Sequence, residues 1–318
     1  MLFASLLVVA GLALLVWGAD RFVAGAAGTA HSLGVAPLII GLTIVGTATS
    51  APEVLVGVSA ALEGKTNIAV GNAIGSNIAN IGLVLGVTIL CKPFIVRSRT
   101  LRREYLLMVF ASLLASALML DHELDFMDGV LLLITLVLLL GGIVRLAKRP
   151  HQDDPLQQEI QKKPKQTPAL GKSLLRLLFG LVILLVGAEW LVDGAVFIAR
   201  TFGISELVIG LTIIAIGTSL PELAASIAGV LKGEAGIAIG NVIGSNMFNM
   251  LMVLGIPCII NPAEFSAAVI YRDIPVMLLL IFIMGMMLFL HSKDKFDKKE
   301  GATLLLCFVS YQTLLFLS

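Results

Sequence analysis

The chain has 318 residues, of which 58% are apolar and only 14% are charged, and its net charge is +1. Soluble domains carry about 25% charged residues, so this composition excludes an ordinary soluble protein. The net charge itself says nothing about nucleic acid, but no basic stripe with interleaved aromatic residues appears, so no nucleic-acid partner is expected. The mean hydropathy of +1.00 and the recurrent apolar windows predict an all-α integral membrane protein that lies in the lipid bilayer.

Ten membrane-spanning helices are predicted in chain order. The first half holds Leu2–Arg21 (or on to His31), Ala36–Leu62, Ile68–Leu90, Glu104–Leu120 and Phe126–Leu146. The second half holds Leu174–Ala199, Leu207–Leu231, Gly236–Ile260, Ile274–Leu290 and Ala302–Leu317. A polar linker, 147–169, separates residues 1–146 from residues 170–318. The N-terminal stretch lacks a basic start and a small-residue cleavage site, so we expect it to be the first span and not a signal peptide.

The two halves resemble each other at an offset of 169 residues. GLTIVGTATSAPEVL (Gly41–Leu55) then aligns with GLTIIAIGTSLPELA (Gly210–Ala224), and GNAIGSNIAN (Gly71–Asn80) aligns with GNVIGSNMFN (Gly240–Asn249). Proline, glutamate, asparagine and serine match, which chance similarity between apolar segments would not produce. Because each copy holds five spans, an odd number, the second copy must insert upside down. We therefore predict two inverted five-helix repeats.

The basic residues predict the orientation of the chain. The linker and its flank carry Lys148, Arg149, Lys162, Lys163, Lys165 and Lys172. Since cytoplasmic loops are rich in Lys and Arg, the linker is expected in the cytoplasm. The basic segments 92–103 and 293–299 fall on the same side by span count, and the acidic loop 121–128 falls on the other. Both termini are thus predicted to be extracytoplasmic, in a multi-pass protein of the plasma (inner) membrane.

Two glutamates lie deep inside predicted spans. Glu53 is about ten residues from the end of its span, roughly 15 Å at 1.5 Å per residue, and Glu222 repeats it in the second half. A charged side chain at this depth costs about 2.5–3.5 kcal/mol on insertion scales. The four spans that carry the repeated motifs contain no Lys or Arg. Glu53 and Glu222 are therefore expected to bind a metal cation.

Proline and hydroxyl residues surround each glutamate. Pro52 removes the helical partner of the carbonyl group of Ala48, and Pro221 does the same for Gly217. Freed carbonyl groups at membrane depth are tolerated only where protein, water or an ion satisfies them. Two hydroxyl side chains stand four and three residues before each glutamate, on the same helix face: Thr49 and Ser50, then Thr218 and Ser219.

The next span of each half adds polar side chains at a four-residue period. These are Asn72, Ser76 and Asn80 in the first half, and Asn241, Ser245 and Asn249 in the second. We expect the serines and the last asparagines to bind the cation, and Asn72 and Asn241 to support the site. Carboxylate, hydroxyl, amide and main-chain oxygens, without His or Cys, favour hard cations such as Na⁺ and Ca²⁺.

These paired motifs resemble those of the calcium/cation antiporter superfamily, above all its prokaryotic sodium/calcium exchanger family, over essentially the whole chain. The resemblance implies ten helices and alternating access, in which the first and sixth spans slide past a rigid core. It also implies that main-chain oxygens near Gly46 and Ala215 join the cation ligands. The sequence departs from the family at Ala48, where glycine is usual, and at Asn249, where some relatives have aspartate.

The leading hypothesis is a secondary active antiporter that exchanges Na⁺ for Ca²⁺, with these ions as its partners and with no cofactor. Asparagine at both Asn80 and Asn249 leaves two formal negative charges, which balance one Ca²⁺ and argue against K⁺ co-transport. A proton- or potassium-coupled exchanger stays open, because buried glutamates can carry protons. A passive channel would not need a duplicated, proline-broken site. The spans contain no paired catalytic aspartates, Ser/His pair or HExxH motif, so no enzyme is expected. The oligomeric state is not predictable from the sequence.

Overall fold

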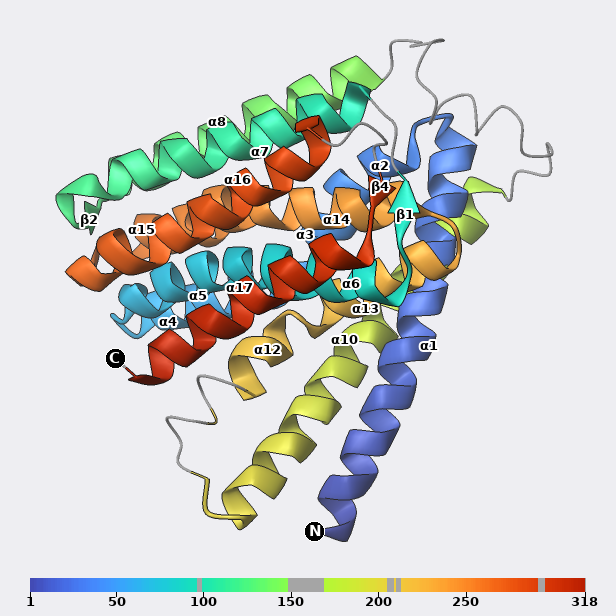
Figure 1. Ribbon diagram of the computed structural model, residues 1–318, viewed down its shortest axis with the longest axis horizontal. Coiled ribbons are helices and arrows are strands. Elements are labelled where there is room, and N and C mark those ends of the chain that lie inside the picture. The colour runs from blue at the N-terminus through green and yellow to red at the C-terminus, as the bar shows by residue number, and fades with distance from the viewer. Residues whose placement is uncertain (96–98, 148–168, 205–208, 210–212, 291–294, 318) are drawn as a thin grey trace.

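The computed structural model describes residues 1–95, 99–147, 169–204, 209, 213–290 and 295–317, and it is helical apart from four short strands (Figure 1). In this part of the chain, seven helices are long and apolar enough to cross a membrane, or eight if one bent pair is a single span. The predicted all-α, multi-span membrane protein is therefore confirmed. Residues 148–168 of the predicted linker and part of the predicted span Leu207–Leu231 lie outside the described residues. The count of ten spans stays a prediction.

The two longest helices form a pair that crosses the other helices at a steep angle (Figure 1). They are α1 (Leu2–Leu33) and α10 (Leu170–Thr201), with 32 residues each. Glycines recur every seven residues in their contact: Gly11, Gly18 and Gly25 on α1, and Gly180, Gly187 and Gly194 on α10. A Cβ atom at Gly18 would lie 2.5 Å from the backbone nitrogen of Leu184. The two backbones are thus in direct contact, as small residues allow between membrane helices.

A helix in each half breaks immediately before its glutamate. The first comprises α2 (Pro37–Ile40), the π-helix η1 (Gly41–Val45), α3 (Gly46–Thr49) and α4 (Ala51–Leu62). It bends by 40° between α3 and α4. The described part of the second comprises α12 (Ala215–Thr218) and α13 (Leu220–Leu231). Both breaks fall on the serine two residues before a proline, which cannot donate a helical hydrogen bond.

The next helices of each half lie at the centre of the molecule. They comprise α5 (Thr66–Ala79), η2 (Asn80–Leu85) and α6 (Gly86–Cys91), then α14 (Ala235–Phe248), η5 (Asn249–Val253) and α15 (Gly255–Ile260). Their most apolar stretches are 72% and 78% buried, against 22% for α8 (Phe126–Ala147). The exposed apolar face of α8 fits contact with lipid, because a soluble protein rarely exposes such a surface.

Peripheral helices and paired strands complete the fold (Figure 1). They are α7 (Arg99–Leu118), the 3₁₀ turn η3 (Met119–Asp121), the π-helix η6 (Val269–Asp273), α16 (Ile274–Leu290) and α17 (Lys298–Leu317). Strand β1 (Phe94–Ile95) pairs with β4 (Lys295–Phe296), and β2 (Glu123–Leu124) pairs with β3 (Ala263–Glu264), both antiparallel. The two ribbons lie at opposite ends of α7, so each joins loops from both halves of the chain at one end of the molecule.

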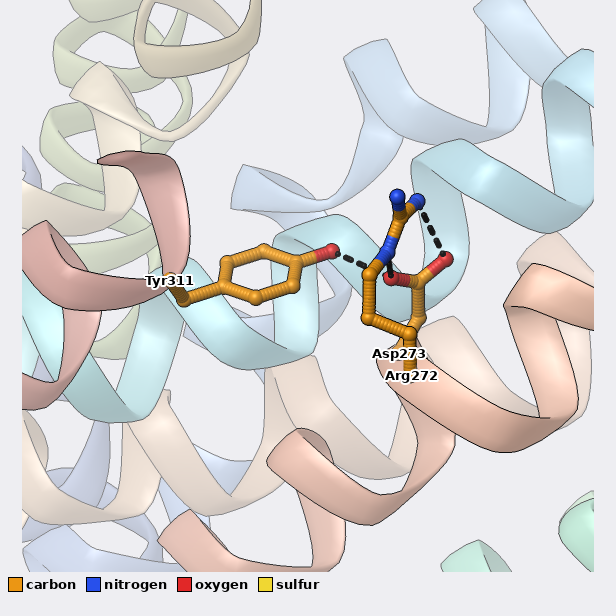
Figure 2. Close-up of polar contacts among 3 residues, drawn as sticks. All are labelled: Arg272, Asp273 and Tyr311. Atoms are coloured by element: carbon orange, nitrogen blue, oxygen red, sulfur yellow. Dashed lines mark hydrogen bonds and ion pairs between the residues drawn. The ribbon is translucent and has the colours of Figure 1, made fainter. Parts of the chain in front are cut away.

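An arginine–acid pair recurs at the offset of 169 residues, a match that the motif comparison missed. Arg272 Nε donates to Asp273 Oδ1 at 2.7 Å, and the Tyr311 hydroxyl of α17 donates to the same oxygen at 3.0 Å (Figure 2). In the first half, Arg103 Nε donates to Glu104 Oε1 at 2.9 Å. Each pair lies near the start of a peripheral segment, α7 or η6–α16. Similar side chains thus occupy equivalent positions in both halves.

Candidate functional site

Two buried glutamates form the centre of the site. Glu53 and Glu222 are each 1% exposed and lie in the first turn of α4 and α13. The N-terminus of a helix carries partial positive charge, which favours a carboxylate there. One carboxylate oxygen of each, Oε2, is buried without a hydrogen-bond partner among the described residues. An orphaned anionic oxygen is costly in a protein interior, so both oxygens are available to a cation.

The hydroxyl groups of Thr49 and Ser50, in the first half, form hydrogen bonds with the second half. The hydroxyl of Ser50 donates to Glu222 Oε1 at 3.4 Å, and that of Thr49 donates to Asn241 Oδ1 at 3.1 Å. Ser50 lies at the break, where its φ of −81° and ψ of 5° end α3 before α4 begins. The helix bends by 40° there, so both hydroxyl groups stand at the bend that precedes Glu53.

Thr218 and Ser219 occupy the equivalent break in the second half. Ser219, with φ of −88° and ψ of 2°, separates α12 from α13. Its hydroxyl is buried without a hydrogen-bond partner among the described residues. Thr218 is half-buried, whereas its counterpart Thr49 is fully buried. The two halves of the site are therefore not equally accessible.

Asn72 and Asn241 form hydrogen bonds with the main chain of the two glutamates. Asn72 Nδ2 donates to the carbonyl oxygen of Glu53, and Asn241 Nδ2 to that of Glu222, both at 3.2 Å. Asn241 Nδ2 also donates to Ser226 Oγ at 3.1 Å. Each asparagine thereby joins a broken helix to the central helix that follows it.

Ser76, Asn80, Ser245 and Asn249 are all at least 95% buried on the central helices. The Asn80 Oδ1 atom and both polar side-chain atoms of Asn249 have no hydrogen-bond partner among the described residues. Asn80 and Asn249 also begin the π-helical segments η2 and η5. Such single-turn π segments are frequent at functional sites. The structure thus leaves unpartnered amide groups at equivalent positions of the two halves.

The main-chain candidates lie around the two breaks. The carbonyl oxygen of Gly46 accepts long hydrogen bonds, of 3.4 Å, from the hydroxyls of Thr49 and Ser245. Ala48 is half-buried on the last turn of α3. Ala215 begins α12, and Gly217 lies one residue before Thr218 on it. The Gly46 oxygen also accepts the backbone N–H of Ser50 at 3.2 Å. Main-chain carbonyl oxygens are among the ligands that Ca²⁺ takes in proteins.

A cavity of about 400 Å³ reaches the site from one side. Residues of α4, α10, α12 and α13 line it, including Pro52, Glu189, Gly217, Thr218 and Pro221. Thr218 is thus accessible from this cavity, while Thr49 is 0% exposed.

The donor set suits a hard cation. Among the residues that the structure describes, no group of three or more His, Cys, Asp or Glu side chains could hold a metal ion. Two carboxylates with neutral hydroxyl, amide and carbonyl oxygens are instead typical ligands of Na⁺ and Ca²⁺. Half-helices that meet at such a site, deep in a multi-span protein, are the arrangement found in ion-coupled membrane transporters.

The comparisons give the family. The model of the sodium/calcium exchanger protein family matches residues 3–144 and 172–317, and the chain belongs to this family. CaxA of Alkalimonas amylolytica is 48% identical to this chain over the full length of both chains. The inner membrane protein YrbG of Escherichia coli (strain K12) is 45% identical, over 90% of this chain and 89% of its own. A structure of the sodium-calcium exchanger NCX_Mj, soaked with zero Na⁺ and Ca²⁺, is similar with a TM-score of 0.85 and 31% identity, over 99% of each chain.

Proposed function

We propose that this protein is a secondary active antiporter that exchanges Na⁺ for Ca²⁺ by alternating access. Membership of the sodium/calcium exchanger family supports the class of transporter. The observation that carries the assignment to this site is the pair of buried carboxylates, Glu53 and Glu222, each with an oxygen that no described group satisfies. A bound cation would satisfy both.

The charge of the site explains why two kinds of ion alternate there. One Ca²⁺ neutralises the two carboxylates, and two Na⁺ would do the same, so the ions compete for the same ligands. The ligand set that we propose comprises Glu53 and Glu222 with Thr49, Ser50, Ser76, Asn80, Thr218, Ser219, Ser245, Asn249 and the carbonyl groups of Gly46, Ala48, Ala215 and Gly217. Asn72, Asn241, Pro52 and Pro221 hold these ligands in place.

We also propose an inverted-repeat architecture. Residues 1–146 and 170–318 form two five-helix repeats that insert in opposite directions, joined by a cytoplasmic linker at 147–169. Both termini then face the outside. The plasma (inner) membrane as the location is supported by the name of the similar inner membrane protein YrbG. In this orientation the cavity beside α12 opens toward the outside, and α1 with α10 moves against the remaining helices to change access.

The test is ⁴⁵Ca²⁺ uptake into proteoliposomes loaded with Na⁺, K⁺ or a proton gradient, for wild type, E53Q and E222Q. We expect uptake that requires internal Na⁺ and falls by about 100-fold or more in either variant, because loss of one partner from a buried ion pair costs about 3–5 kcal/mol. E123Q, in strand β2 away from the site, is the control and should keep wild-type uptake. Uptake driven equally by a proton gradient would contradict sodium coupling and favour a proton-coupled exchanger.

A further inference from the structure

The tight turns that follow α4 and α13 carry opposite charges on the same backbone shape. Residues 63–65 read Glu-Gly-Lys, and residues 232–234, at the offset of 169, read Lys-Gly-Glu. Gly64 and Gly233 are both left-handed, with φ of 73° and 76°, a conformation that favours glycine after a helix. The two turns are therefore alike in geometry and inverted in charge.

One of these turns forms an ion pair with the long helix pair. Lys232 Nζ lies 2.5 Å from Asp20 Oδ1 on α1, so the pair joins α1 to the end of α13. The positions equivalent to Asp20 and Lys232 are Glu189 on α10 and Glu63 after α4. Lys65 Nζ instead lies 2.9 Å from Glu63 Oε2 within its own turn. The same contact in the other half would thus bring two carboxylates together, which repel each other.

Asp20 and its counterpart Glu189 each line a cavity. The Asp20–Lys232 pair lies at a cavity of about 330 Å³ between α1 and α13, which Leu15, Ala19 and Ile227 also line. None of the predicted cation ligands lines that cavity. The larger cavity between α10 and α4 contains Glu189 and reaches Thr218. The cavity that holds the ion pair therefore does not reach the proposed cation site, whereas the cavity that holds Glu189 does.

We propose that the Asp20–Lys232 ion pair is a latch that favours the access state in which the cavity beside α12 is open. This inference rests on the proposed alternating access. When α1 and α10 shift to the opposite state, Asp20 leaves Lys232 and Glu189 approaches Glu63, so an attraction is exchanged for a repulsion. Lys232 and Asp20 keep side-chain exposures of 30% and 49%, and partly exposed pairs are weak. The ion pair therefore shifts the equilibrium between the two access states by about two- to fivefold.

The test measures access directly, without transport. A single cysteine replaces Ile227 in a background without Cys91, Cys258 and Cys307, and its reaction with a membrane-impermeant maleimide is timed in the absence of Na⁺ and Ca²⁺. We expect the labelling rate to rise about two- to fivefold in D20N and in K232E/E234K. The charge reversal D20K/K232D should restore the original rate. K92Q is the matched control, because Lys92 Nζ also reaches this end of α13 but bonds a carbonyl group, that of Leu231, at 3.3 Å.

The mirror variant gives a second, independent test. E63K/K65E turns residues 63–65 into Lys-Gly-Glu and creates a partner for Glu189, so it should also raise labelling at position 227 and lower labelling of a cysteine at Leu55, which lines the other cavity. Unchanged labelling in D20N and in both turn variants would overturn the latch. If labelling shifts as expected but wild type takes up no Ca²⁺ against Na⁺, the latch stands and the assignment of the ions fails.

Discussion

Asn72 and Asn241 occupy equivalent positions and make the same bond to the carbonyl group of a glutamate, yet their surroundings differ. Asn241 is 0% exposed and also bonds Ser226 and Thr49, so it connects three elements. Asn72 is half-buried, and among the described residues its side chain forms one hydrogen bond, that to the carbonyl oxygen of Glu53. Although they occupy equivalent positions in the repeat, the two asparagines therefore contribute unequally to the stability of the protein.

We predict that N241A impairs the protein more than N72A. Each buried hydrogen bond contributes about 0.5–1.5 kcal/mol, and N241A also leaves the Thr49 hydroxyl without its best acceptor. The expected result is a lower melting temperature in detergent and at least tenfold weaker Ca²⁺ uptake for N241A, with a smaller change of both for N72A. Equal losses in the two variants would show that the extra contacts of Asn241 carry no weight.

At this scale the sequence predicts the glutamates and the polar stripe, because proline, carboxylate and amide residues are expensive in an apolar span. It does not predict that Ser50 bonds Glu222 and not Glu53. That pairing depends on the direction in which the chain leaves the break at Ser50, and on how closely the two halves approach each other. Both are properties of tertiary packing, which the spacing of residues along one helix does not contain.

Among the elements, the contact between α1 and α10 depends on glycine at every seventh position. A Cβ atom at Gly187 would lie 2.4 Å from the backbone nitrogen of Leu15, and one at Gly25 would lie 2.3 Å from that of Leu177. These distances leave no room for a side chain, and the atoms approached are backbone atoms that cannot turn away. The pair is thus suited to move as one body.

We predict that G18V separates α1 from α10. Overpacking of a close contact typically costs about 1–3 kcal/mol, and here the valine side chain would meet the backbone of Leu184. The melting temperature should fall by several degrees, with loss of Ca²⁺ uptake. G142A on α8 is the control, since no described atom lies within 4 Å of the added Cβ and alanine favours the helix. A wild-type melting temperature in G18V would contradict the close contact.

The elements were predictable to different degrees. The long helices follow from apolar windows, and α1 does run past His31, to Leu33. The breaks follow from Pro52 and Pro221. The π segments that begin at Asn80 and Asn249 do not, because an extra residue within a turn is set by the packing of its neighbours and leaves no periodic signal in the sequence.

For the whole molecule, the two strand ribbons define two ends. Pairing of Phe94 with Phe296 brings the basic loops of both halves to one end. Pairing of Glu123 with Glu264 brings the acidic loop 121–128 to the other end, beside a loop of the second half. The charge count predicted the same grouping without knowledge of the strands. We therefore expect the bilayer normal to run from one ribbon to the other, and the direction of insertion follows from the charges of the loops.

The positive-inside rule gives that direction, because short loops rich in Lys and Arg stay in the cytoplasm. We predict that alkaline phosphatase fused after Ser318 is active, since this enzyme needs the oxidising exterior, and that the same enzyme inserted after Gln157 in the linker is inactive. Green fluorescent protein at the same two positions should give the opposite pattern. Activity of the phosphatase in the linker would show that the chain inserts in the opposite orientation. The cavity beside α12 would then open to the cytoplasm and receive Ca²⁺ from there.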